Sequence, residues 1–281
     1  MNWQQGKRWR FQDGLAVKGP LNPGGFDFRN YYRSKGIAVK VYGKTYFGSE
    51  GTAYPCPAVL ERVKEHCAQV LNTCCTPKDA AVFMAMLLGD SGEMEKGQRE
   101  LYQDSGIAHL LAVSGQHLSV IGGGIYLILR KLGFGFTGAG AAGAVLVLNY
   151  GLLTGGSGSA MRAVIMILCL WLAKKEGRTY DTLSALGMAA VLLLWQQPYL
   201  VFQSGFQLSF LAVWAIAGPG MGLCRLLGLE KGWQKGAAVS LCIQMILTPV
   251  MLWHYFKYPL YVMVLNVLIL PFVPVLMISG L

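Results

Sequence analysis

Residues 106–124 read GIAHLLAVSGQHLSVIGGG, and here a polar N-terminal third gives way to almost unbroken apolar sequence. The run is long enough to cross a bilayer, which takes about 20 mostly apolar residues. A plain lipid anchor would not carry His109, Ser114, Gln116 and His117 through its middle. Polar side chains at bilayer depth usually face a bundle interior or a wet cavity, so we interpret this span as a polar lining, with packed histidines as the alternative.

The charged residues divide the chain into a polar module and a membrane module. Of the 281 residues, 54% are hydrophobic and 14% are charged, whereas soluble domains average roughly 25% charged. Residues 1–106 contain 14 Lys/Arg and 11 Asp/Glu, and the remaining 175 residues contain 10 and 3. The net charge of +10 suits an anionic partner, either nucleic acid or the headgroups of a lipid bilayer. Membrane proteins are, however, often basic for reasons of topology alone.

Narrow charged windows interrupt the apolar sequence after Gly106 and predict about seven membrane spans. The predicted spans lie at 107–129, 138–153, 159–173, 182–196, 200–217, 236–255 and 258–281. Alternate loops differ in charge, with eight Lys/Arg in one set and only Lys257 in the other. By the positive-inside rule the first set lies in the cytoplasm, which places the N-terminal module outside. We therefore expect an all-α polytopic membrane protein preceded by a small, extracytoplasmic, partly β segment.

The chain divides into three predicted domains. Residues 1–55 include alternating runs such as IAVKVYGKTYF between glycines and prolines, which predict short strands. Residues 56–106 predict an amphipathic or re-entrant helical segment, because the apolar run 80–88 is too short to span and ends at Gly89. Residues 107–281 are the predicted transmembrane domain.

A glycine-rich turn precedes the third predicted span. It reads TGGSGS at 154–159, contains Ser157 and Ser159, and is followed by Arg162. A glycine-rich turn that leads into a helix can bind phosphate through backbone N–H groups and the positive end of the helix dipole. The spacing allows Arg162 either to extend outward toward the membrane surface or to project inward toward a polyanion.

The fifth predicted span also carries polar residues, namely Gln203, Ser204, Gln207 and Ser209. On a helix, Gln203 and Gln207 share a face at spacing i, i+4. Such a face suits either hydrogen bonds between helices or a hydrated lining.

Five motifs follow one another along the chain. They are NPGGFDFRNYYRSKGI at 22–37, LLGDS at 87–91, HLLAVSGQH at 109–117, LLTGGSGSAMRAVIM at 152–166 and SGFQLSFLAV at 204–213. In this order they resemble segments of ComEC-type DNA-internalisation proteins, bacterial membrane proteins that pass single-stranded DNA into the cytoplasm. Gln116 departs from that family's SG-x-H motif, in which an apolar residue is expected, and makes the local face more polar.

The resemblance implies a channel component in the bacterial inner membrane that imports single-stranded DNA during transformation, alongside other competence-machinery proteins. It also implies a piece of a longer protein, in which residues 1–55 are the end of an OB-like domain. The resemblance favours an inward Arg162 and a pore-lining fifth span. No catalytic residue and no cofactor are expected, because any nuclease activity would belong to a C-terminal domain outside this sequence. The expected DNA path or polar lining contains His109, Ser114, Gln116, His117, Ser157, Ser159, Arg162, Gln203, Gln207 and Ser209.

Two other functions fit parts of the sequence. A small-anion transporter would use the same helix N-terminus and Arg162, although we detect no repeated halves, which are common in that class. A rhomboid-like intramembrane serine protease would use Ser157, in the pattern Gly155-Gly156-Ser157-Gly158, with a histidine on a later helix. The later histidine is His254, 97 residues further on and near a predicted helix end.

The cysteines do not have the spacing of a zinc site. Cys56, Cys67, Cys74 and Cys75 lack a C-x-x-C pair, and only His66 lies nearby, so no bound metal is expected. Outside the cell, a disulfide from Cys56 or Cys67 to the Cys74/Cys75 pair is one possibility, and reduced thiols are the other.

Overall fold

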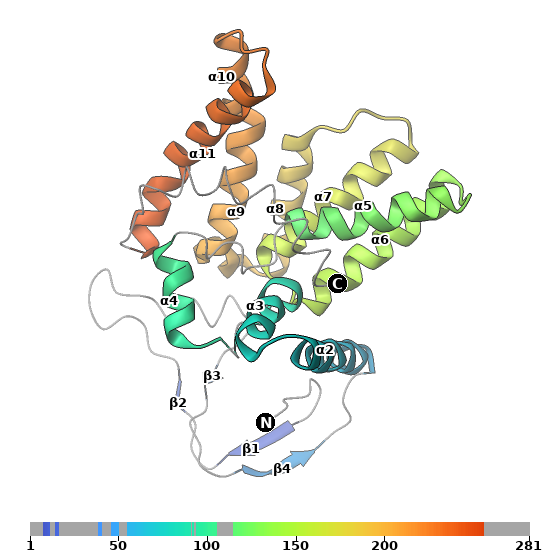
Figure 1. Ribbon diagram of the computed structural model, residues 1–281, viewed down its shortest axis with the longest axis vertical. Coiled ribbons are helices and arrows are strands. Elements are labelled where there is room, and N and C mark those ends of the chain that lie inside the picture. The colour runs from blue at the N-terminus through green and yellow to red at the C-terminus, as the bar shows by residue number, and fades with distance from the viewer. Residues whose placement is uncertain are drawn as a thin grey trace.

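The structure is a computed structural model, and it describes residues 8–11, 15–16, 39–40, 46–50, 55–90, 92, 94–105 and 115–255. The helices of residues 115–255 form a bundle, and the N-terminal helices and short strands lie at one end of it (Figure 1). Three of the predicted lining residues are therefore described incompletely or not at all. His109 and Ser114 lie outside the described residues, and only the backbone of Gln116 is described.

Among the described residues of the N-terminal region, four short strands form two pairs. Strand β1 (Arg8–Phe11) pairs antiparallel with β4 (Tyr46–Glu50), and β2 (Leu15–Ala16) pairs antiparallel with β3 (Val39–Lys40). Two pairs of this size do not identify a fold, so an OB-like domain stays a prediction.

Helices α2 (Pro55–Cys74) and α3 (Pro77–Leu88) pack together, and α4 (Lys96–Asp104) follows them. The start of α3 is capped by Thr76, whose hydroxyl accepts the N–H of Asp79. Helix α3 ends at Gly89, which has a φ of +70°, a left-handed conformation that glycine adopts without strain. The helix predicted at 80–88 is confirmed, although its apolar side chains are buried against protein. Its position at a membrane interface stays a prediction.

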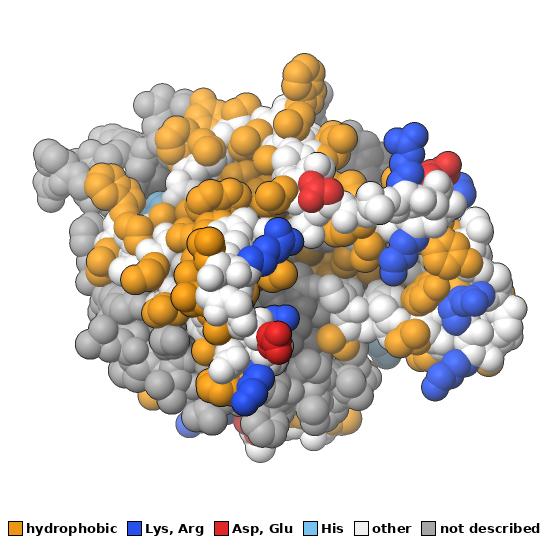
Figure 2. Space-filling view, turned by 90° about the horizontal axis from the view of Figure 1, so that it is seen from above, with side chains coloured by type: hydrophobic (Ala, Val, Ile, Leu, Met, Phe, Trp, Pro, Cys, Tyr) orange, Lys and Arg blue, Asp and Glu red, His pale blue; other side chains and the backbone are white. Residues whose placement is uncertain are grey.

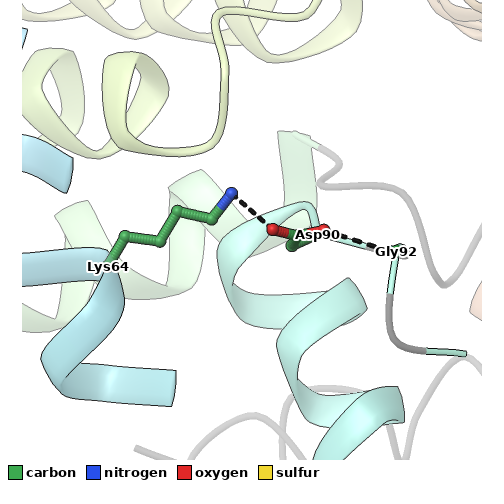
Figure 3. A network of polar contacts seen from close by, with 3 residues as sticks. All are labelled: Lys64, Asp90 and Gly92. Carbon is green, nitrogen blue, oxygen red and sulfur yellow. Dashed lines mark hydrogen bonds and ion pairs between the residues drawn. The ribbon is translucent and has the colours of Figure 1, made fainter. Parts of the chain in front are cut away.

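One ion pair joins α2 to the residue that follows Gly89. The Nζ atom of Lys64 lies 2.8 Å from Oδ2 of Asp90, and the N–H of Gly92 donates to Oδ1 of the same carboxylate at 3.0 Å (Figure 3). The hydrogen bond from Lys64, together with the one from Gly92, holds the pKa of Asp90 below its ordinary value. These contacts fix the C-terminal end of α3 to α2.

Six regions of helix build the bundle, each at or near a predicted span. They are α5 (Gly115–Lys131), α6 (Phe136–Leu153), α7 (Gly158–Lys175), α8 (Thr182–Gln196), the continuous run of α9 (Ser204–Ala215), η3 (Ile216–Gly220) and α10 (Met221–Leu226), and α11 (Gly232–Tyr255). Helix α5 packs on α6 and α7, α7 packs on α8 and α9, and α9 packs on α11. The last predicted span, 258–281, lies outside the described residues.

Three of these helical regions are long and apolar enough to cross a membrane, within the part of the chain that the structure describes. They are α6, the run Ser204–Leu226 and α11. Helices α5 and α8 are shorter, at 17 and 15 residues, and α7 carries one arginine and two lysines. The count of seven spans is therefore not confirmed. Large apolar side chains are nevertheless strongly exposed on several helices, as expected of a surface that faces lipid, including Trp195 and Trp253 at 87% and 79%.

The fifth predicted span has different limits from those that the sequence predicted. A short 3₁₀ turn, η2 (Pro198–Phe202), replaces its first residues, and α9 begins only at Ser204. At the other end the helix does not stop near 217, because the π-helical η3 accommodates Pro219 inside the run. A proline removes one N–H donor, and a wider π turn lets a helix continue past the missing bond.

Connections between the helices lie at two opposite ends of the bundle. The α5–α6, α7–α8 and α10–α11 connections lie away from α2 and α3 (Figure 1). Figure 2 looks from that side and shows Lys and Arg side chains with fewer acidic ones among hydrophobic surface. Eight basic side chains in and beside these connections are exposed, namely Arg130, Lys131, Lys174, Lys175, Arg178, Arg225, Lys231 and Lys235. Their cytoplasmic location stays a prediction.

The C-terminal end of α3 lies against α6. The hydroxyl of Tyr150 donates to the carbonyl oxygen of Leu87 at 2.6 Å. A Cβ atom built on Gly89 would lie 2.9 Å from the carbonyl oxygen of Thr154, a distance that real Cβ atoms essentially never show. Only glycine therefore fits between α3 and the turn that follows α6.

Candidate functional site

The glycine-serine turn before α7 is a helix cap. Gly155 and Gly156 have φ values of +84° and +60°, in the left-handed region that glycine tolerates. The exposed Ser157 accepts the N–H of Ala160 at 3.3 Å, and its hydroxyl lies 3.2 Å from that of the half-buried Ser159. The turn therefore supplies a hydrogen-bond acceptor for a backbone N–H group in the first turn of α7, as serine usually does at this position.

Arg162 lies inside the bundle, so the inward alternative is correct. Its side chain is 8% exposed, and its Nε donates to Oγ of Ser209 on α9 at 2.9 Å. One of its terminal nitrogens lies 3.4 Å from the sulfur of Met166, and its Cζ lies 5.9 Å from the ring centre of Phe210. The guanidinium is thus held between α7 and α9, away from the surface of the bundle.

The outer end of the guanidinium reaches the start of α5. A Cβ atom built on Gly115, the first residue of α5, would lie 3.5 Å from Nη2 of Arg162 and 3.4 Å from Cβ of Ala163. Two residues further along α5, His117 is fully buried. The structure therefore brings Arg162, Ser209 and the first turn of α5 together, as a site that we call the Arg162 site.

The polar residues of α9 face two different neighbours. Ser209 contacts α7. By contrast, Nε2 of Gln207 donates to the carbonyl oxygen of Val201 at 2.8 Å, and Oε1 of Gln207 lies 2.8 Å from Nε2 of His254 on α11. The hydroxyls of Ser204 and Tyr255 lie 3.0 Å apart across the same two helices. Gln207 thus makes the hydrogen bond between helices that the sequence left as one of two alternatives.

The predicted shared face of Gln203 and Gln207 is wrong in its geometry. Gln203 precedes α9 in extended conformation, and its side chain makes no capping hydrogen bond. The i, i+4 rule requires both residues to be helical. Gln203 is half-buried and belongs to neither the Arg162 site nor the Gln207 contact.

Sequence reasoning missed two residues of the Arg162 site. Met166 follows Arg162 at the i, i+4 spacing, which was a usable signal. Phe210 follows Ser209 directly, but its approach to the guanidinium depends on how α9 packs on α7. No local pattern indicates that packing.

The serine protease arrangement does not form. The hydroxyl of Ser157 pairs with Ser159 and with the N–H of Ala160, and the imidazole of His254 pairs with Gln207. A nucleophile and its base need to be hydrogen-bonded to each other, whereas Ser157 and His254 are each hydrogen-bonded to other groups.

Within the described ranges, no group of three or more His, Cys, Asp and Glu side chains is arranged to hold a metal ion. The cysteines whose side chains are described are free thiols: Cys67, Cys74, Cys75, Cys169, Cys224 and Cys242. Cys56 lies outside the side chains that the structure describes.

Comparison with known proteins adds a family and two relatives. The competence protein family model matches residues 86–281. The chain is 25% identical over 250 residues to ComE operon protein 3 of Bacillus subtilis (strain 168), covering 89% of this chain and 32% of that protein. It is also 25% identical over 227 residues to Recombination protein 2 of Haemophilus influenzae (strain ATCC 51907 / DSM 11121 / KW20 / Rd), covering 76% of this chain and 28% of that protein. The chain thus spans about a third of the length of these curated relatives. No solved structure matches it.

Proposed function

Because the chain belongs to the competence protein family, we propose that it contributes to a membrane conduit that carries single-stranded DNA into the bacterial cytoplasm during transformation. The family, the names of the two relatives and the three long apolar helices support this proposal. We propose further that the chain is a non-catalytic, multi-pass part of the inner membrane, with its N-terminal segment outside, and that it works with other proteins of the competence machinery.

The observation that carries the proposal is the buried guanidinium of Arg162. Among the residues that the structure describes, no Asp or Glu forms an ion pair with it. A charge in a low-dielectric interior is costly unless a partner compensates it, and ionisable groups in membrane helices usually mark the path of a substrate or ion. The hydroxyl of Ser209 and the ring of Phe210 compensate only part of this charge. An anionic group beside the guanidinium would compensate the rest of the charge.

The neighbouring helix start reinforces the preference for an anion. The first N–H groups of a helix have no acceptor within that helix, and the positive end of the helix dipole lies there. Gly115 places this end of α5 beside the guanidinium of Arg162. The described start of α5 thus lies close to the guanidinium, and a guanidinium binds phosphate through two parallel N–H bonds.

A DNA strand carries one charge per nucleotide, so a conduit needs contacts that are favourable but weak enough to release each phosphate. A single guanidinium fits this requirement, because it attracts a phosphate without enclosing it. The exposed basic side chains at the far end of the bundle would attract the strand as it leaves.

Two substitutions at Arg162 test the proposal in the full-length protein. Arg162→Ala is expected to abolish uptake of labelled DNA at normal membrane abundance, and Arg162→Lys to retain only part of it, because lysine lacks the planar fork. Arg62→Ala, at an exposed position on α2 away from that basic end, is the control and should take up DNA normally. Normal uptake by Arg162→Ala would remove this residue from the pathway, and a loss of abundance equal to the loss of uptake would assign it a structural role.

A small-anion transporter is the second candidate, because the same guanidinium would bind phosphate or carboxylate. Measuring the uptake of phosphate and of small carboxylates in the same strains distinguishes the two functions. A conduit for DNA predicts that small-anion uptake is equal in the wild-type and Arg162→Ala strains. A transporter predicts that small-anion uptake falls with the substitution.

A further inference from the structure

A pocket lies between α5, α6 and α7, away from the Arg162 site. Its volume is about 210 Å³, it is partly open to the surface, and its lining is almost entirely apolar. The pocket is smaller than the roughly 300–1,000 Å³ of sites that enclose compact drug-sized ligands, so it suits a segment of a flexible chain. Its lining includes Gly123, Tyr126, Phe136, Val147, Trp171 and Lys174.

Glycines shape this pocket in two ways: some allow a side chain to pack directly on a helix backbone, and one leaves space unfilled. A Cβ atom on Gly140 would overlap the indole nitrogen of Trp171, and one on Gly122 would overlap Val147. By contrast, a Cβ atom on Gly123 would meet nothing within 4 Å. The helices therefore approach closely on one side of the pocket and leave space beside Gly123.

The pocket lining extends along α6 over a length close to one leaflet of a bilayer. Its lining on α6 runs from Phe136, the first residue of that helix, to Val147. Eleven residues of helix rise about 16 Å at about 1.5 Å each, and half of a hydrocarbon core of about 30 Å is close to this length. The lining thus extends from the basic end of the bundle over a length close to half of a hydrocarbon core.

The mouth of the pocket is positively charged. Lys174 lines it, and the ammonium group of Lys175 lies 5.7 Å from the ring centre of Trp171. The adjoining α5–α6 and α7–α8 connections add Arg130, Lys131 and Arg178, against two carboxylates, Glu176 and Asp181. A basic pocket between membrane helices, open toward the headgroup level, has the chemistry that recognises an anionic lipid headgroup.

We propose that this pocket binds an anionic phospholipid, with one acyl chain between α5, α6 and α7 and the phosphate beside Lys174. The apolar lining accommodates the chain, and the charge at the mouth favours an anionic headgroup over a zwitterionic one. This site is separate from the Arg162 site and does not depend on the passage of DNA.

Two matched glycine substitutions test the acyl-chain site. Gly123→Leu fills the pocket, and Gly138→Leu places the same side chain on exposed α6 surface that does not line it. Neither new Cβ atom meets an atom within 4 Å, so both variants should fold, and equal melting temperatures would verify this. The full-length protein is reconstituted in equal amounts of phosphatidylglycerol and phosphatidylcholine, and native mass spectrometry counts the lipids that stay bound after purification.

Wild-type protein and Gly138→Leu are expected to retain phosphatidylglycerol in preference to phosphatidylcholine, and Gly123→Leu to lose the retained lipid. Lys174→Ala should lower the preference for phosphatidylglycerol about fivefold, the factor that corresponds to about 1 kcal/mol for one basic residue near an anionic surface. Equal retention by the two leucine variants would overturn the proposal, as would equal retention of the two lipids by the wild-type protein. A homodimer that Gly123→Leu alone abolishes would instead assign the pocket to a second copy of the chain.

Discussion

The Nε atom of Arg162 donates a hydrogen bond to Oγ of Ser209 at 2.9 Å, and this bond joins α7 to α9 inside the bundle. A serine hydroxyl that accepts one bond still has its own hydrogen to donate. Ser209 therefore orients the plane of the guanidinium without neutralising its charge.

Ser209→Ala should weaken both stability and uptake, but less than Arg162→Ala weakens uptake. The lost bond is expected to cost about 1 kcal/mol, between about 0.6 kcal/mol for an average bond between membrane helices and about 1.5–3 kcal/mol for bonds to charged groups. The free energy of unfolding in detergent measures this cost. Ser119→Ala, on an exposed position of α5, is the control and should change neither property.

Gly140→Ala is expected to destabilise the bundle by about 1–3 kcal/mol, because the added methyl group overlaps the indole of Trp171 and forces it to move. Gly138→Ala adds the same methyl group on the same helix, where nothing lies within 4 Å, and should stabilise α6 by up to about 1 kcal/mol through helix propensity. Thermal unfolding of the two variants measures the difference. Equal melting temperatures would show that Trp171 yields to the methyl group at no cost.

The Lys64–Asp90 pair should make the α2–α3 pair sensitive to acid. The pKa of Asp90 is lower in the folded chain than its ordinary value, so the stability that it contributes is present at neutral pH and is lost as the pH falls through the folded pKa. Both side chains are partly exposed, at 34% and 46%, which limits the contribution to less than about 1 kcal/mol. Asp90→Asn should therefore lower the melting temperature at pH 7 and have a smaller effect near pH 3. Glu95→Gln, at an exposed site on the same segment, is the control.

Single-cysteine labelling tests the topology. In a cysteine-free protein in intact cells, Lys175→Cys should not react with an impermeant thiol reagent, because its basic connection is expected to face the cytoplasm. Gln196→Cys, exposed at the opposite end of α8, should react. The reverse pattern would invert the predicted orientation.

Local sequence signals predicted the helix ends but not the contacts between helices. The spans predicted at 138–153 and 182–196 end where α6 and α8 end, and the apolar run 80–88 was predicted to end at Gly89, where α3 ends. Pro219 did not end a helix, because the run continues through a π turn, and whether such a turn forms depends on packing as well as on the residue itself.

The direction of Arg162 shows where sequence reasoning stops. Its position in α7 allowed two orientations, and its partner Ser209 follows 47 residues later on another helix. The resemblance favoured the correct orientation, although periodicity alone had left both open. The division of the α9 polar residues between α7 and α11 likewise became visible only when the three helices were placed together.

The close contact of α3 with α6 connects the position of the α2–α3 pair to the start of α7, the helix that carries Arg162. The hydroxyl of Tyr150 holds the last turn of α3, and Gly89 touches the backbone at Thr154, only three residues before the cap of α7. No side chain separates the two backbones at that point, so no flexible side chain can adjust when one backbone moves toward the other. A displacement of α2 and α3 is therefore expected to shift the start of the helix that carries Arg162.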